Sequence, residues 1–147
     1  MIRVNRVRDG TRQLERILRG FRGASKVKVG FPEGTDSTQG GILDRAVFNE
    51  FGTRDIPERP FMRNGLRDGV PQLRHTARVV ARKVIHGRIT PRQALGQMGE
   101  NGKQLIQDSI TNMRDPPNAA KTIERKGSSN PLIDSGDMHK AVKWEIE

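Results

Sequence analysis

Apolar side chains in this sequence follow two different periods, and each period predicts a different kind of element. Apolar and polar residues alternate over 1–7, 26–31 and 142–146, which predicts three short strands. The last of them closes the sequence, so we expect it at a sheet edge or added to a neighbour's sheet. Most other apolar residues recur at steps of three and four, as on one face of an α-helix. The pattern therefore predicts a mixed fold of helices and strands.

Two helices are predicted in the first third of the chain. Asp9 is a suitable N-cap for the first, which carries an apolar stripe from Leu14 to Phe21 and has a suitable C′ glycine in Gly23. The second covers Ile42–Phe51 and stops at a glycine. Both have one apolar face, so we expect each to pack against other parts of the chain.

A helical hairpin is predicted in the middle of the chain. Steps of four and three from Leu66 to Val84 form a packing seam, and Pro71 requires that this helix begin nearby or kink there. The Thr90-Pro91 pair then starts a second helix, as a cap followed by proline. Three glycines over 96–102 weaken that helix by roughly 1 kcal/mol each relative to alanine, or else permit close approach of another helix.

Proline and glycine place the connections between these elements. The polar, glycine-rich stretch 33–42 predicts a flexible loop, and the prolines of 53–63 predict an extended, ordered segment. Pro116-Pro117 ends the hairpin, and 119–125 predicts a short helix. An aspartate and a serine at 134–135 are candidate caps for a final helical turn.

The composition is typical of a single small domain. A chain of 147 residues with 33% apolar residues and a mean hydropathy of −0.72 has a modest core, so it carries long solvated loops or completes its core against copies of itself. The absence of cysteine excludes disulfides and thiolate metal sites. No signal peptide or membrane-length apolar run is present, which favours a cytoplasmic origin. The predicted class is α+β, one domain over 1–147: a small, mostly antiparallel sheet with a long helical hairpin and an N-terminal helix packed on it.

The net charge of +10 is concentrated in two segments. Residues 1–28 hold nine lysines and arginines against two acidic residues, and residues 63–92 hold eight against one. This asymmetry predicts polyanionic neighbours, either nucleic acid or acidic faces of protein partners. Solvation of exposed helix faces explains the same charge equally well. The candidate basic surface consists of Arg12, Arg16, Arg19, Arg74, Arg78 and Arg82.

No catalytic or metal-binding constellation stands out. The histidines are His75, His86 and His139. They lack ligand spacing, so neither a metal nor a cofactor is expected. Asp134 and Asp137 suit helix capping as well as a carboxylate pair, and Ser135 lacks a nucleophile elbow. The paired glycines lack the Lys-Ser/Thr ending of a phosphate loop. The sequence therefore predicts that the protein is not an enzyme.

Three segments carry a family resemblance. They are Asn49–Thr53 (Asn-Glu-Phe-Gly-Thr), Ile56–Phe61 (Ile-Pro-Glu-Arg-Pro-Phe) and Pro131–Met138 (Pro-Leu-Ile-Asp-Ser-Gly-Asp-Met). In this order they resemble the head–tail joining, neck or tail-completion proteins of tailed bacteriophages, which include putative minor tail components. Residues 141–144 depart from the pattern, because Ala-Val-Lys-Trp stands where that family has Ser-Ile followed by an aromatic residue.

The resemblance implies a structural virion protein that assembles in the host cytoplasm as a ring, expected to hold six copies, at the tail end or the neck. Its implied partners are copies of itself, tail-tube and head-connector proteins and, without sequence preference, passing genomic DNA. The candidate contact residues are Phe48, Glu50, Phe51, Arg54, Glu58, Arg59, Phe61 and Trp144. Burial of the phenylalanines in the chain's own core is an equally good interpretation.

A basic DNA-binding protein is the alternative function. The two positive segments supply phosphate contacts whose strength depends on salt. Aromatic residues make up only 4% of the chain and tyrosine is absent, so platforms for base stacking are scarce. We therefore rank this alternative second.

Overall fold

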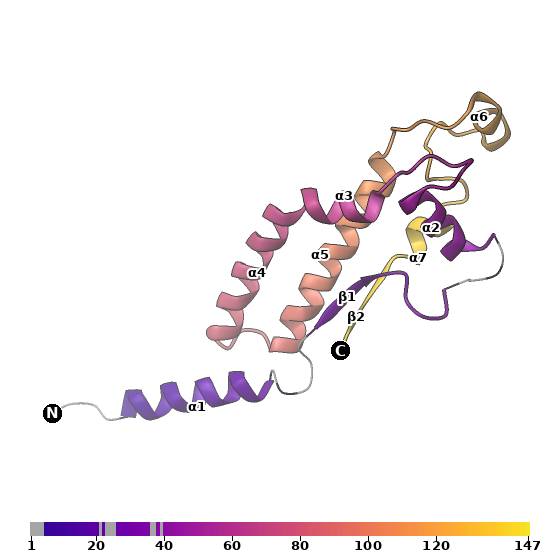
Figure 1. Ribbon diagram of the computed structural model, residues 1–147. Helices are drawn as coiled ribbons and strands as arrows, with labels where there is room; N and C mark the ends of the chain where they lie inside the picture. The colour runs from indigo at the N-terminus through magenta and orange to yellow at the C-terminus, as the bar shows by residue number, and fades with distance from the viewer. Residues whose placement is uncertain (1–4, 21, 23–25, 36–37, 39) are drawn as a thin grey trace.

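The computed structural model describes residues 5–20, 22, 26–35, 38 and 40–147, and within them the chain has an α+β fold (Figure 1). The elements in chain order are α1 (Asn5–Gly20), β1 (Val27–Gly30), α2 (Ile42–Phe51), α3 (Phe61–Asp68), α4 (Val70–Ile85), α5 (Pro91–Asn112), α6 (Ala120–Lys126), α7 (Asp137–Ala141) and β2 (Lys143–Ile146). The two strands pair antiparallel, as predicted.

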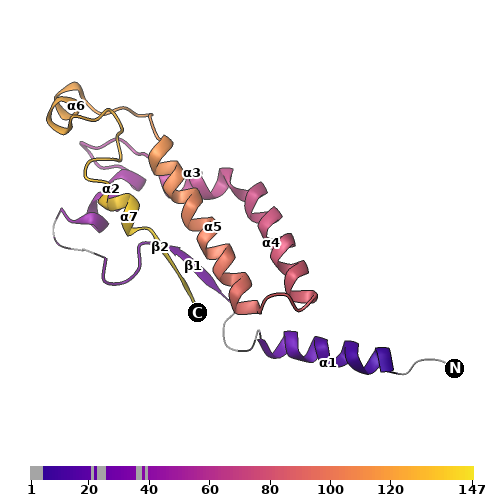
Figure 2. The same ribbon diagram turned by 180° about the vertical axis from the view of Figure 1, so that it is seen from behind.

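Helix α5 is the centre of the fold, with α3 and α4 on one side and the two-stranded sheet on the other (Figures 1 and 2). It begins with a capping box in which Thr90 Oγ1 accepts from the backbone N–H of Gln93, and Gln93 Oε1 accepts from that of Thr90. The predicted restart of a helix at Thr90-Pro91 is therefore confirmed.

The sheet crosses α5 at its glycines. Val29 of β1 lies opposite Trp144 of β2, and both side chains face the helix. A Cβ atom added at Gly99 would lie 2.7 Å from Cδ2 of Trp144, and one at Gly102 would lie 3.0 Å from Cγ2 of Val29. These glycines permit a close approach, as one of the two interpretations held, but they admit the sheet and not a second helix.

The main core lies where α2, α3, α5 and α7 meet. Phe61, Ile106, Ile110 and Val142 are fully buried there, and the ring of Phe31 meets that of Phe61 edge-on at 6.3 Å. A smaller cluster lies between α4 and α5, around Val80, Val84 and Ala94. The hairpin thus has an apolar seam of its own, separate from the main core.

The predicted N-terminus is wrong in the part that the structure describes. Residues 5–7 are helical, so a strand over 1–7 is excluded there, and residues 1–4 lie outside the described residues. Asp9 lies inside α1 and is not its cap, while Phe21 and Gly23 also lie outside the described residues. Helix α1 contacts the end of the α4–α5 hairpin, where Gln13 Nε2 donates to the carbonyl of Ile85. Its main contacts are with α4 and α5, so the predicted packing of this helix on the sheet is not observed.

Two smaller predictions are corrected, and the structure decides between the two alternatives of a third. The extended segment ends at Pro60, because α3 starts at Phe61. The first arm of the hairpin consists of two helices, with Gly69 between them and Pro71 in the first turn of α4, as one of the two alternatives held. Gly136 is the N-cap of α7, with φ of 80°, and Oγ of the preceding Ser135 accepts from the N–H of Asp137, the first residue of that helix, at 3.4 Å. The N-cap therefore lies one residue after the expected 134–135, at a glycine whose left-handed conformation other residues rarely adopt.

Candidate functional site

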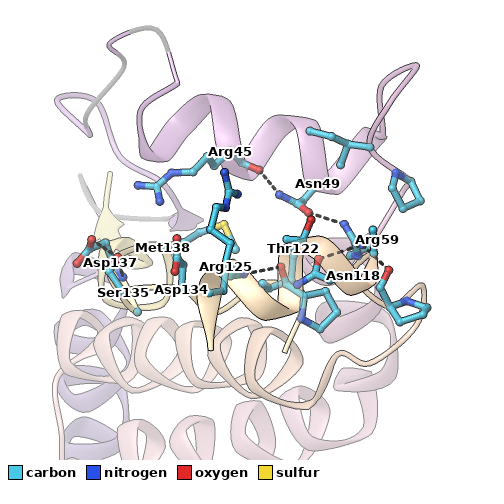
Figure 3. Close-up of a pocket in the computed structure, with 18 of the residues that line it drawn as sticks. Arg45, Asn49, Arg59, Asn118, Thr122, Arg125, Asp134, Ser135, Asp137 and Met138 are labelled. Carbon is cyan, nitrogen blue, oxygen red and sulfur yellow. Dashed lines mark hydrogen bonds between the residues drawn. The ribbon is translucent and has the colours of Figure 1, made fainter. Parts of the chain in front are cut away.

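The three segments that carry the family resemblance meet around one cavity of about 670 Å³. Its walls come from α2, the 53–60 segment, α6 and the loop before α7 (Figure 3). Two of these walls contain resemblance segments: Ile56–Phe61 after α2, and Pro131–Met138 in the loop that leads into α7. Residues far apart in the sequence therefore build a single site.

Arg59 links the two halves of this cavity. Its side chain is buried, and its Nε donates to the carbonyl of Pro116 at 2.7 Å while Nη2 donates to that of Pro117 at 3.0 Å. Nη1 donates to Oδ1 of Asn49 on α2 at 3.1 Å. Burial lowers the pKa of this guanidinium. Every one of these acceptors is neutral, so the positive charge is held by dipoles and not by a carboxylate.

Glu50 joins α2 to the start of α3. Its carboxylate is buried and accepts from the backbone N–H groups of Met62 at 2.9 Å and Arg63 at 3.1 Å. These groups belong to the first turn of α3, where a helix offers free donors and a positive dipole end. Nε of Arg63 adds a charge-assisted bond at 2.9 Å. Hydrogen bonds to Glu50 and then to Glu58 raise the pKa of Arg63.

Three of the predicted contact residues are therefore used inside the chain. Phe61 is fully buried in the main core, and the side chains of Glu50 and Arg59 are only 4% exposed. Their expected role at a subunit surface is corrected, because each already has its partners in this chain. For Phe61 the alternative interpretation, burial in the chain's own core, holds.

The other predicted contact residues lie at the surface or pack against α5. Phe48 is 40% and Phe51 is 65% exposed on the outer face of α2, beside Val47 at 43%. Arg54 and Glu58 are exposed, and Glu58 accepts from Arg63. Trp144 of β2 is half-buried against α5, and its indole N–H donates to Glu100 at 2.8 Å.

The guanidinium of Arg63 lies 5.2 Å from the centre of the Phe51 ring. This cation–π contact holds the ring against the Glu50 network from one side and leaves most of it open to solvent. The position of Phe51 is thus set by a charge network that reaches into the interior of the chain.

Three further cations lie near Arg59, and sequence reasoning did not select them. Lys126 Nζ is 3.5 Å from the carbonyl of Asn130 and 3.4 Å from that of Pro131. Burial lowers its pKa, and repulsion from neighbouring guanidinium groups adds to that effect. The other two cations are Arg45 on α2 and Arg125 on α6. The charge of the 119–126 stretch could have indicated Arg125 and Lys126, but their meeting with Arg45 depends on tertiary structure.

The predicted basic surface divides into two parts. Arg12 and Arg16 line a groove of about 980 Å³ together with Arg88 and Arg92, which flank the start of α5 and were not predicted. Arg19 is exposed and pairs with Glu15 at 3.6 Å. The remaining three arginines are exposed at every fourth position of α4: Arg74, Arg78 and Arg82.

Comparison of the chain with protein-family models, with curated proteins and with solved structures finds no match.

The described residues contain neither a cluster of metal ligands nor a membrane-spanning helix. No three side chains among their histidines, aspartates and glutamates are grouped as metal ligands. The histidines lie apart, on α4, just after it and on α7. No described helix is both long and apolar enough to span a bilayer. The candidate site is therefore the basic cavity together with the exposed face of α2.

Proposed function

We propose that this protein is a structural, non-catalytic virion component of a tailed phage that forms a ring at the neck or tail end and joins the tail to the head connector. The observation that carries this proposal is that two polar side chains of residues 48–61 lie in the interior while two aromatic ones lie at the surface. Glu50 and Arg59 are buried and fix the shape of this region, whereas Phe48 and Phe51 are exposed.

An exposed pair of phenylalanines is unfavourable in an isolated chain. Covering apolar surface contributes about 25 cal/mol per Å², so a partner that covers Phe48, Phe51 and Val47 gains free energy. Because buried hydrogen bonds already hold α2 and α3 together, little order has to be gained on binding. A rigid apolar face with a charged rim suits a contact between identical subunits.

The sheet supports the same role. It has two strands among the described residues, so one edge of β1 and one edge of β2 carry no strand partner there. Two-stranded sheets are marginal alone, and a free edge readily pairs with another chain. Ring closure between copies supplies a neighbour for such edges.

The proposal is tested by assembly with tail tubes purified from the phage that encodes the chain. We expect negative-stain images to show added density at one end of the tubes, and light scattering to show a discrete oligomer as protein concentration rises. Phe51→Ser should prevent both. Ile85→Ser is the matched control, because Ile85 is 58% exposed on a different surface. Tubes without end density, or normal assembly by Phe51→Ser, would contradict the proposal.

DNA binding is the second candidate, and the groove that holds Arg12, Arg16, Arg88 and Arg92 favours it. Four guanidinium groups on one surface can contact successive phosphates. Competition gel shifts at physiological salt distinguish the two functions. Sequence preference for a duplex would support an independent DNA reader, whereas weak, salt-sensitive binding without preference fits a junction protein that DNA passes.

A further inference from the structure

The cavity of Figure 3 collects positive charge that the chain itself does not neutralise. Four cationic side chains line it: Arg45, Arg59, Arg125 and Lys126. Among the described residues, the ion pairs within 4.0 Å include none of these four. The hydrogen bonds of Arg45, Arg59 and Lys126 go to backbone carbonyls and amide oxygens.

Three aspartates also line the cavity, and none of them forms an ion pair with the cations. Asp137 accepts from the hydroxyl of Ser135 and lies 4.0 Å from Lys140, outside the cluster. Asp55 and Asp134 are exposed. Burial first, and then repulsion from three guanidinium groups, lowers the pKa of Lys126 despite the attraction of Asp134. The three aspartates therefore lie near the four cations without pairing with them.

The cations are arranged in two groups. Arg45, Arg125 and Asp134 gather at one end of the cavity, and Arg59 lies with Asn49 and Asn118 at the other (Figure 3). Arg59 is fixed by its acceptors, whereas Arg125 is exposed and has no carboxylate within pairing distance in the described chain. Arg59 is thus fixed and buried, whereas Arg125 is available to a ligand.

The rest of the lining is apolar enough to hold side chains as well as charge. Ile56, Pro57, Pro131 and Leu132 contribute to the walls, and Leu132 also belongs to the main core. A volume of about 670 Å³ accommodates a few residues of an extended peptide. Duplex DNA is too wide to enter a cavity of this kind.

We propose that this cavity binds an acidic segment of a protein partner, with carboxylates paired to Arg45, Arg125 and Lys126 and apolar neighbours resting on the proline-lined wall. The carboxylate contacts are of the charge-assisted type, and the guanidinium groups can form two parallel hydrogen bonds to one carboxylate. This site goes beyond the junction role, and it is measured on the isolated protein without any virion part.

The test uses a fluorescein-labelled peptide of alternating glutamate and leucine, and its partner in which glutamine replaces every glutamate. Fluorescence anisotropy should show saturable binding of the acidic peptide and little binding of the neutral one. Arg125→Gln and Lys126→Gln should each weaken the affinity roughly tenfold, as expected for loss of one charged contact. Added salt should weaken binding to the unmodified protein more than binding to either variant.

Matched controls separate the cavity from general surface charge. Arg74→Gln and Arg78→Gln remove equally exposed arginines from α4, away from the cavity, and should leave the peptide affinity unchanged. Circular dichroism and thermal unfolding confirm that each variant is folded. Arg125→Gln keeps the test valid if Lys126→Gln perturbs its loop, because the Arg125 side chain is exposed.

Several results would overturn the proposal. They are the absence of saturable binding up to about 1 mM peptide, equal affinity for the glutamine peptide, unchanged affinity in folded Arg125→Gln, or an equal loss in Arg74→Gln. Displacement of the peptide by duplex DNA, with the same sensitivity to Arg125→Gln, would assign the cavity to phosphates instead. Tube-end assembly by Arg125→Gln separates the two proposals, because the peptide site can fail while the junction role stands.

Discussion

The indole of Trp144 lies directly against the backbone of Gly99, with Cδ2, Cε3 and Cγ all within 2.8 Å of where a Cβ atom at residue 99 would be. This contact joins the last strand to the central helix. The ring is a rigid group whose indole N–H is bonded to Glu100, so it cannot move away freely. The closeness of sheet and helix therefore depends on the absence of one side chain.

Gly99→Ala is expected to destabilise the protein by roughly 1–3 kcal/mol, as overpacking does in a well-packed site. Alanine improves intrinsic helix stability by about 1 kcal/mol, so a net loss of stability means that the clash with Trp144 outweighs this gain. Urea unfolding followed by circular dichroism measures it. Gly10→Ala on α1 is the control, because a Cβ there meets nothing within 4 Å and should not destabilise. Equal stability of Gly99→Ala and the unmodified protein would exclude the close contact.

The Trp144–Glu100 pair predicts a pH dependence at the same place. The hydrogen bond from the indole, and then that from Lys103, lowers the pKa of Glu100 from its ordinary value of 4.5. A carboxylate with a lowered folded pKa stabilises the fold above pH 4.5, and this contribution is lost as the pH falls through the folded pKa.

Trp144 is the sole tryptophan, so its fluorescence reports on this bond directly. An acid titration of the folded protein should show an emission change with a midpoint below 4.5. Glu100→Gln should abolish that transition and flatten the dependence of stability on pH in the same range. A midpoint at or above 4.5 would show that the indole does not favour the charged carboxylate.

Glu50 and Glu58 both bond Arg63, yet they predict opposite outcomes when replaced by alanine. Glu50 is buried and also satisfies two backbone donors of α3, so Glu50→Ala should cost roughly 1–3 kcal/mol by leaving these part-buried donors without their acceptor. Glu58 is exposed, and its removal should cost under about 1 kcal/mol. Thermal and urea unfolding of the two variants in parallel gives the comparison, and similar losses would refute the capping role of Glu50.

Local patterns were sufficient to predict most elements. Ile42–Phe51 was predicted at its observed bounds, and the Thr90-Pro91 start of α5 follows from the capping chemistry of that pair. The N-terminal prediction failed because alternation over a few residues is weak evidence when a helix follows at once. The N-cap of α7 is Gly136 and not one of the polar residues expected, because the chain is left-handed at that position.

The candidate site was harder to predict than the elements, because it is made by tertiary contacts. Glu50 and Arg59 lie within a segment that is mostly at the surface, and charged residues there are usually solvated. Their burial follows from the free N–H groups of α3 and from the carbonyls of Pro116 and Pro117, which lie far along the chain. Single-residue patterns carry no information about such distant acceptors.

Arg59→Lys tests whether the shape of its guanidinium, and not merely its charge, holds the cavity together. Three acceptors on two segments, Asn49 on one and the carbonyls at 116 and 117 on the other, take bonds from three different nitrogens. A lysine keeps the charge, but its three donor hydrogens sit on one nitrogen and cannot reproduce the planar fork that reaches all three acceptors, so part of this bonding is lost. We expect a loss of roughly 2–4 kcal/mol in urea unfolding, with faster amide exchange in residues 116–118. Arg54→Lys in the same segment is the control, since that side chain is exposed. If the two variants unfold at the same urea concentration, the forked geometry is not what joins α2 to the segment after α5.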